Sequence, residues 1–224
     1  MKKNYLFLMV ISLIILLSLN LILKPNIRDF SVLDTNNKRL MIIAHPDDEV
    51  MWAFNELINE NYLVVCMTCG SNKKRIKEFT RVMKYTNDDY IMLNYPDKVN
   101  GERSNWSIEY SNIKNDLERI IGYKRWDIVL THNPKGEYGH IQHILTSNIV
   151  TDISDKNNLM YFGKYYKNNK LPSNLKKIDN NILDKKKYVI NNFYKSQKNV
   201  LNGMSHMYSY EKIISYREWN EVYE

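Results

Sequence analysis

The sequence predicts an α/β fold, a Rossmann-like three-layer arrangement with a mainly parallel sheet, preceded by a single transmembrane helix. Three observations predict it. From residue 38 onwards, short apolar runs alternate with amphipathic stretches, which is the pattern of βαβ units. Two groups of polar residues directly follow apolar runs, and parallel sheets bind ligands at the carboxyl ends of their strands. Residues 5–23 carry no charge, and as a helix they would span about 28 Å, close to the thickness of a bilayer core.

The 224 residues are enough for one domain with an appendage. We expect an uncleaved membrane anchor at residues 5–23, because no small-residue cleavage site follows the apolar run. Residues 24–37 are polar and predict a linker, and residues 38–224 predict one folded domain. Basic residues after the apolar run outnumber those before it. This count leans towards a domain that faces the cytosol, at the endoplasmic reticulum or the plasma membrane.

Each element of the domain follows from its local pattern of apolar residues. Apolar runs predict strands at residues 39–44, 62–68, 90–94, 127–131 and 159–166. Amphipathic stretches predict helices at residues 50–60, 73–86, 108–121, 140–150 and 185–199. The polar stretch 167–181 predicts a loop.

The formal net charge is +7, and residues 161–198 hold ten lysines against two aspartates. A solvated surface explains this excess, and an anionic substrate or a membrane surface would also fit it. No nucleic-acid-reading motif accompanies the charge, so we expect no nucleic-acid partner. Cys66 and Cys69 have CxxC spacing, but there is no second pair. Half of a four-ligand zinc site is not a site, and two ordinary thiols are favoured.

The first polar group is His45-Pro46-Asp47-Asp48-Glu49, which follows the strand predicted at residues 39–44. Burying such charges without partners would cost several kcal/mol each. A metal ion is the simplest counter-charge. Glu49 is expected to open the next helix, since a carboxylate is favourable at a helix N-terminus.

The second polar group, HNPKGEYGHIQH at residues 132–143, holds three of the five histidines. His140 and His143 are three residues apart and would share one helix face. A catalytic zinc has three protein ligands and keeps one position for water. His45, one aspartate of the pair and one of the two later histidines would make such a set. The remaining aspartate and histidine would then transfer protons during hydrolysis of an amide or ester.

The motifs AHPDDE and HNPKGEYGHIQH together resemble those of the LmbE-like, or PIG-L-like, zinc-dependent de-N-acetylases. The resemblance covers residues 39–200. It implies bound Zn²⁺ and the removal of an N-acetyl group from an N-acetylglucosamine-containing glycoconjugate. N-acetylglucosaminyl-phosphatidylinositol is one such substrate. The resemblance also implies that His45, Asp48 and His143 bind the zinc ion and that Asp47 is the general base.

The resemblance implies roles for three further residues. His140 would be a positively charged partner that stabilises the oxyanion or protonates the leaving amine. Tyr138 would help to polarise the acetyl carbonyl, and Arg75 would contact the polar end of the substrate. There are two departures from the family's pattern: Cys69 replaces a usual polar residue, and Gln142 stands where aspartate is common.

Two other interpretations are open to test. A catalytically silent module that binds a glycan or a membrane would retain the fold, but the complete set of ligands and base argues against it. A nucleotide-binding Rossmann protein is disfavoured, because no glycine-rich loop follows the first strand. The expected partners are therefore an N-acetylated amino sugar, free or lipid-linked, and a membrane bound through residues 5–23.

Overall fold

The computed structural model describes residues 9, 11–12 and 31–223. Except for residues 9, 11 and 12, the expected anchor at residues 5–23 lies outside this part, as does the expected linker up to residue 30. Among the described residues, no helix combines the length and the apolar composition needed to cross a membrane.

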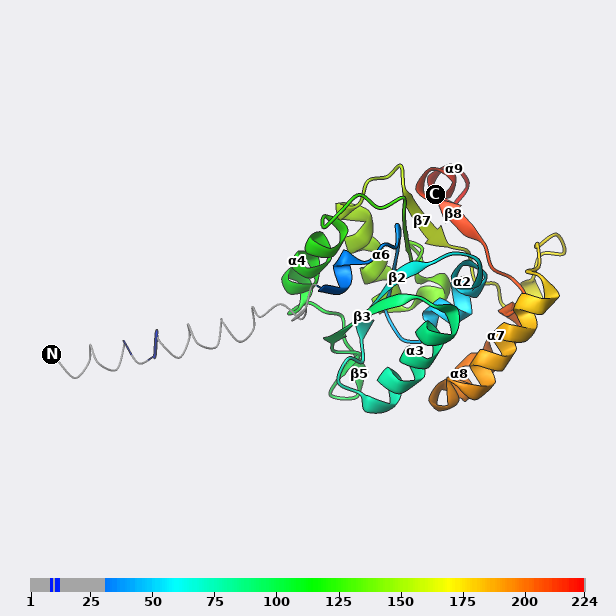
Figure 1. Cartoon of the computed structure of the whole chain (residues 1–224), viewed down its shortest axis with the longest axis horizontal. Coiled ribbons are helices and arrows are strands. Elements are labelled where there is room, and N and C mark those ends of the chain that lie inside the picture. Colours follow the sequence, from blue (N-terminus) through cyan, green and yellow to red (C-terminus); the bar gives the residue numbers. More distant parts are fainter. Residues whose placement is uncertain (1–8, 10, 13–30, 224) are drawn as a thin grey trace.

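A six-stranded sheet forms the centre of the domain (Figure 1), in the order β3-β2-β1-β6-β7-β8. β7 and β8 pair antiparallel, and all the other neighbours pair parallel. The predicted α/β fold with a mainly parallel sheet is therefore confirmed. The strands are β1 (Arg39–Ile43), β2 (Tyr62–Thr68), β3 (Asp89–Tyr95), β6 (Ile128–Thr131), β7 (Leu159–Phe162) and β8 (Ile213–Ser215). Two short strands, β4 (Lys98–Val99) and β5 (Glu102–Arg103), form a separate hairpin.

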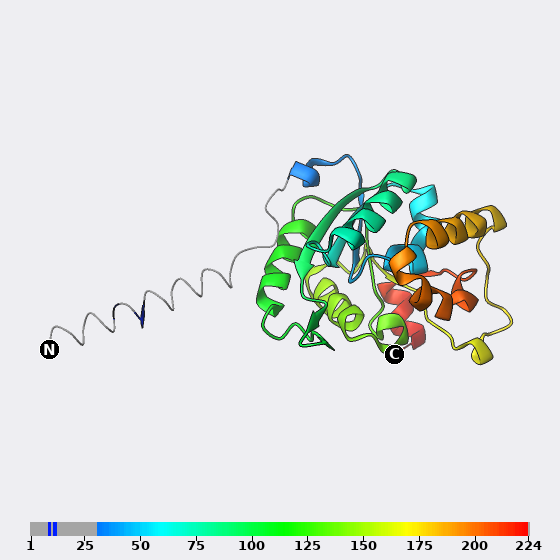
Figure 2. The ribbon, with the colours of Figure 1, turned by 90° about the horizontal axis from the view of Figure 1, so that it is seen from below.

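Helices cover both faces of the sheet (Figure 2). Successive side chains of a strand point to opposite faces, so Leu40 and Ile42 of β1 belong to one apolar cluster and Met41 and Ile43 to the other. The first cluster includes residues of α4 (Tyr110–Ile121), α6 (Ile141–Ile153) and α9 (Tyr216–Tyr223). The second includes residues of α2 (Asp48–Asn59), α3 (Lys73–Thr86), α7 (Asn180–Asn192) and α8 (Lys198–Gly203).

The structure differs from the prediction mainly at the two ends of the domain. Residues 31–34 form a 3₁₀-helix (η1, Ser31–Asp34) whose Leu33 is buried in the core, so this part of the expected linker packs on the domain. The strand expected at residues 159–166 ends at Phe162. The helix expected at residues 185–199 begins at Asn180, because Asp179 accepts a hydrogen bond from the N–H of Asn181. It ends at Asn192, and three short helices follow it: η3 (Lys195–Gln197), α8 and η4 (Ser205–Met207).

β1 and β6 are direct neighbours and run parallel. Their carboxyl ends therefore lie side by side, and the segments that follow them, residues 44–49 and 132–143, meet beyond the carboxyl-terminal ends of the strands.

Candidate active site

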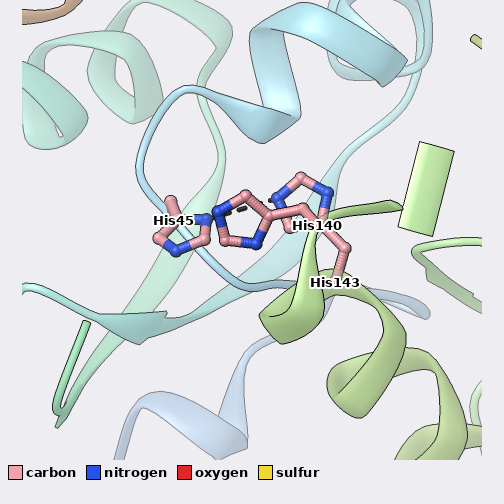
Figure 3. A group of neighbouring side chains, drawn as sticks. All are labelled: His45, His140 and His143. Atoms are coloured by element: carbon pink, nitrogen blue, oxygen red, sulfur yellow. Dashed lines mark hydrogen bonds between the residues drawn. The ribbon is translucent and has the colours of Figure 1, made fainter. Parts of the chain in front are cut away.

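Three side chains from the two motifs converge beyond these strand ends. His45 Nδ1 lies 3.3 Å from His143 Nε2 and 3.4 Å from Asp48 Oδ2. His143 Nε2 lies 3.3 Å from Asp48 Oδ1. Figure 3 shows the ring of His45 close to those of His140 and His143. Ligand atoms around a tetrahedral zinc ion are about 3.3–3.4 Å apart, because the zinc–ligand bonds are about 2.0–2.1 Å. The two nitrogens have this spacing, and each lies at a similar distance from one oxygen of Asp48, Oδ2 for His45 and Oδ1 for His143. The three side chains are therefore suited to holding one metal ion.

Apart from their mutual contact of 3.3 Å, the hydrogen bonds of His45 and His143 leave one nitrogen of each neutral ring without a partner. His143 Nδ1 donates to Glu137 Oε2 at 2.6 Å, and His45 Nε2 donates to Gln142 Oε1 at 2.7 Å. The side-chain N–H groups of Gln142 donate to two backbone carbonyls, which turns its oxygen towards His45. With the tautomers assigned from these partners, the lone pairs of His45 Nδ1 and His143 Nε2 are free to bind a metal.

His132 and His140 lie in the same cluster, and their ring nitrogens belong to groups of potential metal ligands within 4.8 Å of one another. The nitrogens of His132 are both engaged, because Nε2 accepts the N–H of Ala44 at 2.9 Å and Nδ1 donates to Glu137 at 3.0 Å. His140 Nδ1 accepts the N–H of Gln142 at 3.2 Å, which places the proton of the neutral ring on Nε2. Neither ring keeps a free lone pair for a metal.

Glu137 is a buried site residue that the sequence patterns did not single out. Its Oε2 accepts hydrogen bonds from both His132 and His143, and its Oε1 accepts the N–H of Asn133 at 3.0 Å. Its backbone has φ 53° and ψ −71°, the rare and strained region of the classic γ-turn. Gly136 before it has φ 59°, and a Cβ there would lie 2.7 Å from Cγ1 of Ile144. A buried carboxylate held in this strained conformation indicates a residue of the site. In the sequence, only the neighbouring glycines point to this unusual backbone.

The electrostatics of the cluster favour a cation beside Asp48. Burial would raise the pKa of Asp48, but His143 and His132 outweigh burial and lower it well below its ordinary value. Burial would lower the pKa of His45, but hydrogen bonds to Asp48 and Asp97 outweigh burial and raise it to about 10. Asp48 therefore stays ionised, and without a metal the protonated ring of His45 supplies the positive charge next to it. A bound metal ion would take the place of that proton.

Asp47 lies beside the ligand triad. It precedes α2 with a left-handed backbone (φ 116°), which is strained for a residue other than glycine. Its Oδ2 lies 3.2 Å from Arg75 Nη2, and its N–H donates to Glu49 Oε2 at 2.9 Å. Burial raises the pKa of Asp47 to about 6, although the charge of Arg75 opposes this shift. Such a carboxylate accepts a proton readily near neutral pH.

Arg75 is 7% exposed. It donates to the carbonyl of Pro46 and contacts Asp47, and its Nη1 lies 3.4 Å from both Glu78 Oε2 and Ser196 Oγ. Arg75 borders the cavity described below, yet these contacts hold the loop that carries Asp47. Its contact with a substrate stays a prediction.

Glu49 begins α2 together with Asp48, as expected. It is buried and accepts hydrogen bonds from the N–H of Asp47 and the hydroxyl of Tyr194. Burial raises the pKa of Glu49 to about 8. Through these two hydrogen bonds, Glu49 connects the loop that carries Asp47 to the segment that follows α7.

His140 and Tyr138 complete the wall of the site. Burial, together with the charges of His143 and His45, lowers the pKa of His140 to about 3. His140 is therefore a neutral donor through Nε2 in the free protein, and its role as a positively charged partner during the reaction stays a prediction. Tyr138 is 41% exposed, and its ring lies 6.4 Å from that of Trp52. Burial raises the pKa of the Tyr138 hydroxyl above its ordinary value and keeps it protonated.

A cavity of about 320 Å³ opens over these residues. Lys98 and Arg103 of the β4–β5 hairpin line it, as do the apolar side chains of Val200, Leu201 and Met204. Cys69, which has a left-handed backbone (φ 68°), also borders it. Cys66 and Cys69 are both free thiols.

Solved structures with the same fold are similar to this chain. A conserved protein of Thermus thermophilus matches with a TM-score of 0.56 and 16% identity, over 80% of this chain and 94% of that one. A deacetylase of the teicoplanin biosynthesis pathway matches with a TM-score of 0.56 and 18% identity, over 74% of this chain and 87% of that one. At these identities the matches establish the fold.

Sequence comparison establishes the family. An uncharacterised protein of Acanthamoeba polyphaga mimivirus is 37% identical over 158 residues, which cover 61% of this chain and 68% of that protein. The family model "PIG-L: GlcNAc-PI de-N-acetylase" matches residues 40–154, which include both motifs. The chain is thus a member of the PIG-L, or LmbE-like, de-N-acetylase family.

Proposed function

We propose that this protein is a zinc-dependent de-N-acetylase that hydrolyses the acetamide of an N-acetylated amino sugar. One observation carries the proposal. Of the four clustered histidines, His45 and His143 keep a free lone pair, and both free nitrogens lie within 3.4 Å of Asp48. Family membership supports the same reaction.

The residues fit distinct roles in amide hydrolysis. His45, Asp48 and His143 would hold the Zn²⁺ ion, which supplies a Lewis acid and a water molecule that ionises near neutral pH. Asp47 is free of the ligand set, and its carboxylate takes the proton of the attacking water. That proton is then available to the leaving amine.

Two donors face the acetyl group in this proposal. His140 donates a hydrogen bond from Nε2 to the oxygen on which negative charge develops. The hydroxyl of Tyr138 polarises the acetyl carbonyl. Both groups act as neutral donors, which agrees with the directions of their pKa shifts.

The rim of the cavity supports an anionic glycoconjugate as the substrate. Lys98 and Arg103 lie directly opposite each other across the hairpin, and like charges in this arrangement destabilise it. A bound phosphate or carboxylate would relieve their repulsion. Val200, which is 55% exposed, and Met204 offer an apolar surface at the same cavity. N-acetylglucosaminyl-phosphatidylinositol combines these properties, and residues 5–23 would place the domain at a membrane.

Acetate release by the purified full-length protein tests the proposal. We expect release from N-acetylglucosaminyl-phosphatidylinositol or N-acetylglucosaminyl-malate at a higher kcat/KM than from neutral N-acetylglucosaminyl-inositol or chito-oligosaccharides. A chelator should abolish release, and zinc should restore it. The double variant K98Q/R103Q should raise KM for the anionic substrates and leave that of the neutral ones unchanged. Zinc-loaded protein that releases acetate from none of these compounds would contradict the proposal, and retained glycan binding would then favour a silent module.

A further inference from the structure

Helix α2 is interrupted directly behind the site. Ala53 has φ −146° and ψ 28°, far from helical values. In a continuous helix the carbonyl of Met51 would accept the N–H of Asn55. Here the carbonyl of Met51 accepts Lys186 Nζ at 2.8 Å, and the N–H of Asn55 donates to Glu211 Oε2 at 2.8 Å. Two side chains from distant segments thus satisfy both groups of one helical hydrogen bond.

Lys186 and Glu211 also form an ion pair, with Lys186 Nζ 2.6 Å from Glu211 Oε1. Their side chains are 0% and 4% exposed. A buried ion pair seldom adds net stability, because removing both charges from water offsets their attraction. Apolar side chains at these positions would leave Met51 and Asn55 free to bond to each other. The stability of the fold therefore does not explain why Lys186 and Glu211 are buried here.

The interruption separates the part of α2 that serves the site from the part that packs in the core. Before it, Asp48 contacts both ligand histidines, Met51 lines the cavity, and the ring of Trp52 lies 6.4 Å from that of Tyr138. After it, Phe54 and Leu57 are buried against the sheet. If α2 were continuous, the packing of its second half against the sheet would also determine the direction of its first turn.

We propose that Lys186 and Glu211 are positioning residues: they hold the interruption in α2 and thereby set where its first turn presents Asp48 and Trp52. The proposal rests on the proposed function for its effect on turnover. Its effects on metal affinity and on the backbone at Ala53 do not depend on which substrate the protein takes.

The test compares two double variants of the full-length protein. K186M/E211L removes both the charges and the hydrogen bonds. We expect it to fold with an unfolding midpoint at or above that of the wild type and to show a continuous α2 in its crystal structure. Zinc affinity should fall about tenfold, as for loss of a support of a metal ligand. The kcat should fall about 10²-fold, as for a small misplacement of reacting groups, with KM much less affected. K186Q/E211Q keeps a donor for Met51 and an acceptor for Asn55, and we expect it to restore most of the zinc affinity and kcat.

The exposed ion pair Lys114–Asp152 provides a matched control, since K114M/D152L should change none of these quantities. A folded K186M/E211L that keeps zinc affinity and kcat within about twofold of the wild type would overturn the proposal. Failure of K186M/E211L to fold would also overturn it, because the pair would then serve stability. If the wild type hydrolyses no N-acetylated substrate, the proposed function fails, while zinc affinity and the backbone at Ala53 still decide this inference.

Discussion

The two halves of the site are supported in different ways. We call residues 44–49 the β1 half and residues 131–143 the β6 half. The side chains of the β6 half are held mainly by one another, although Asn133 and Gln142 also donate to backbone carbonyls outside this half. Within it, Glu137 binds two histidine rings, and Asn133 and Glu137 exchange hydrogen bonds. Its one strained residue lies next to a glycine that tolerates the turn.

The β1 half depends on residues far away in the sequence. Arg75 of α3 holds the carbonyl of Pro46, and Tyr194 donates to Glu49. Lys186 and Glu211 hold the helix that continues this half. A short motif can thus be held in place by its own hydrogen bonds or by residues from other parts of the fold. Substitutions near the C-terminus should therefore damage the β1 half and spare the β6 half.

The largest expected effect is the loss of the base in the β1 half. Asp47→Ala should lower kcat by about 10²–10⁴-fold, because the attacking water loses its proton acceptor. Zinc affinity should stay close to that of the wild type, because Asp47 lies outside the ligand triad. Turnover and zinc titration measured on one preparation check both statements, with Asp155→Ala as a surface control. Loss of zinc in D47A together with its retention in D48A would reverse the two assignments.

Next in size is the loss of the support inside the β6 half. Glu137→Gln should weaken zinc binding by about 10–100-fold, since the amide lacks the negative charge that holds both rings and turns its NH₂ group towards the N–H of Asn133. Competition with a chromophoric chelator measures this affinity. The exposed residue Glu102 supplies the control, E102Q, which should bind zinc as the wild type does. Unchanged zinc affinity in E137Q would mean that the β6 half is held by other contacts.

A smaller effect is expected when a distant residue that supports the β1 half is changed. Tyr194→Phe removes the hydroxyl that donates to the buried Glu49 and should lower the free energy of unfolding by about 1–3 kcal/mol. Because Glu49 holds the N–H of Asp47, kcat should fall more than zinc affinity. Denaturant unfolding and steady-state kinetics measure these effects, with Tyr188→Phe, at a tyrosine that is 53% exposed on α7, as the control. Equal losses of kcat and zinc affinity in Y194F would show that Tyr194 supports the zinc ligands as much as it supports Asp47.

The smallest effect concerns a carboxylate outside both halves. Asp88 accepts the N–H of Tyr62 at 2.7 Å, and burial raises its pKa from 3.8 to about 7. Between these values the folded protein binds the proton more tightly than the unfolded chain, so this group lowers the free energy of unfolding as pH rises through that window. Asp88→Asn should flatten this pH dependence and leave zinc affinity unchanged. A steeper decline in D88N, measured by denaturant titration across the window, would contradict the burial of an uncompensated charge.

The sequence predicted the parallel sheet because each strand is a short apolar run and each covering helix has one apolar face. It predicted no element after residue 199, where η4, β8 and α9 lie. β8 has only three residues, and its antiparallel pairing with β7 depends on contacts that the local sequence pattern does not indicate. α7 begins earlier than its apolar stripe suggested, because of the cap at Asp179.

Six of the seven predicted site residues belong to the two motifs and lie beyond the carboxyl ends of β1 and β6, and Arg75 of α3 contacts one of them, Asp47. The sequence missed the groups whose roles depend on distant partners. Lys186 stands in a lysine-rich stretch that predicts a solvated surface, yet it is fully buried because Glu211 approaches it from the segment before β8. Gln142 was noted as a departure from the family's pattern, and its role in orienting His45 appeared once their distance was known.

The position of the bound metal tests the assignment most directly. Crystals of the zinc-loaded protein, measured at the zinc absorption edge, should show one ion per chain. It should lie about 2.0–2.2 Å from His45 Nδ1, a carboxylate oxygen of Asp48 and His143 Nε2. An ion bound through His132 or His140, or a folded and active protein that binds no ion, would contradict it.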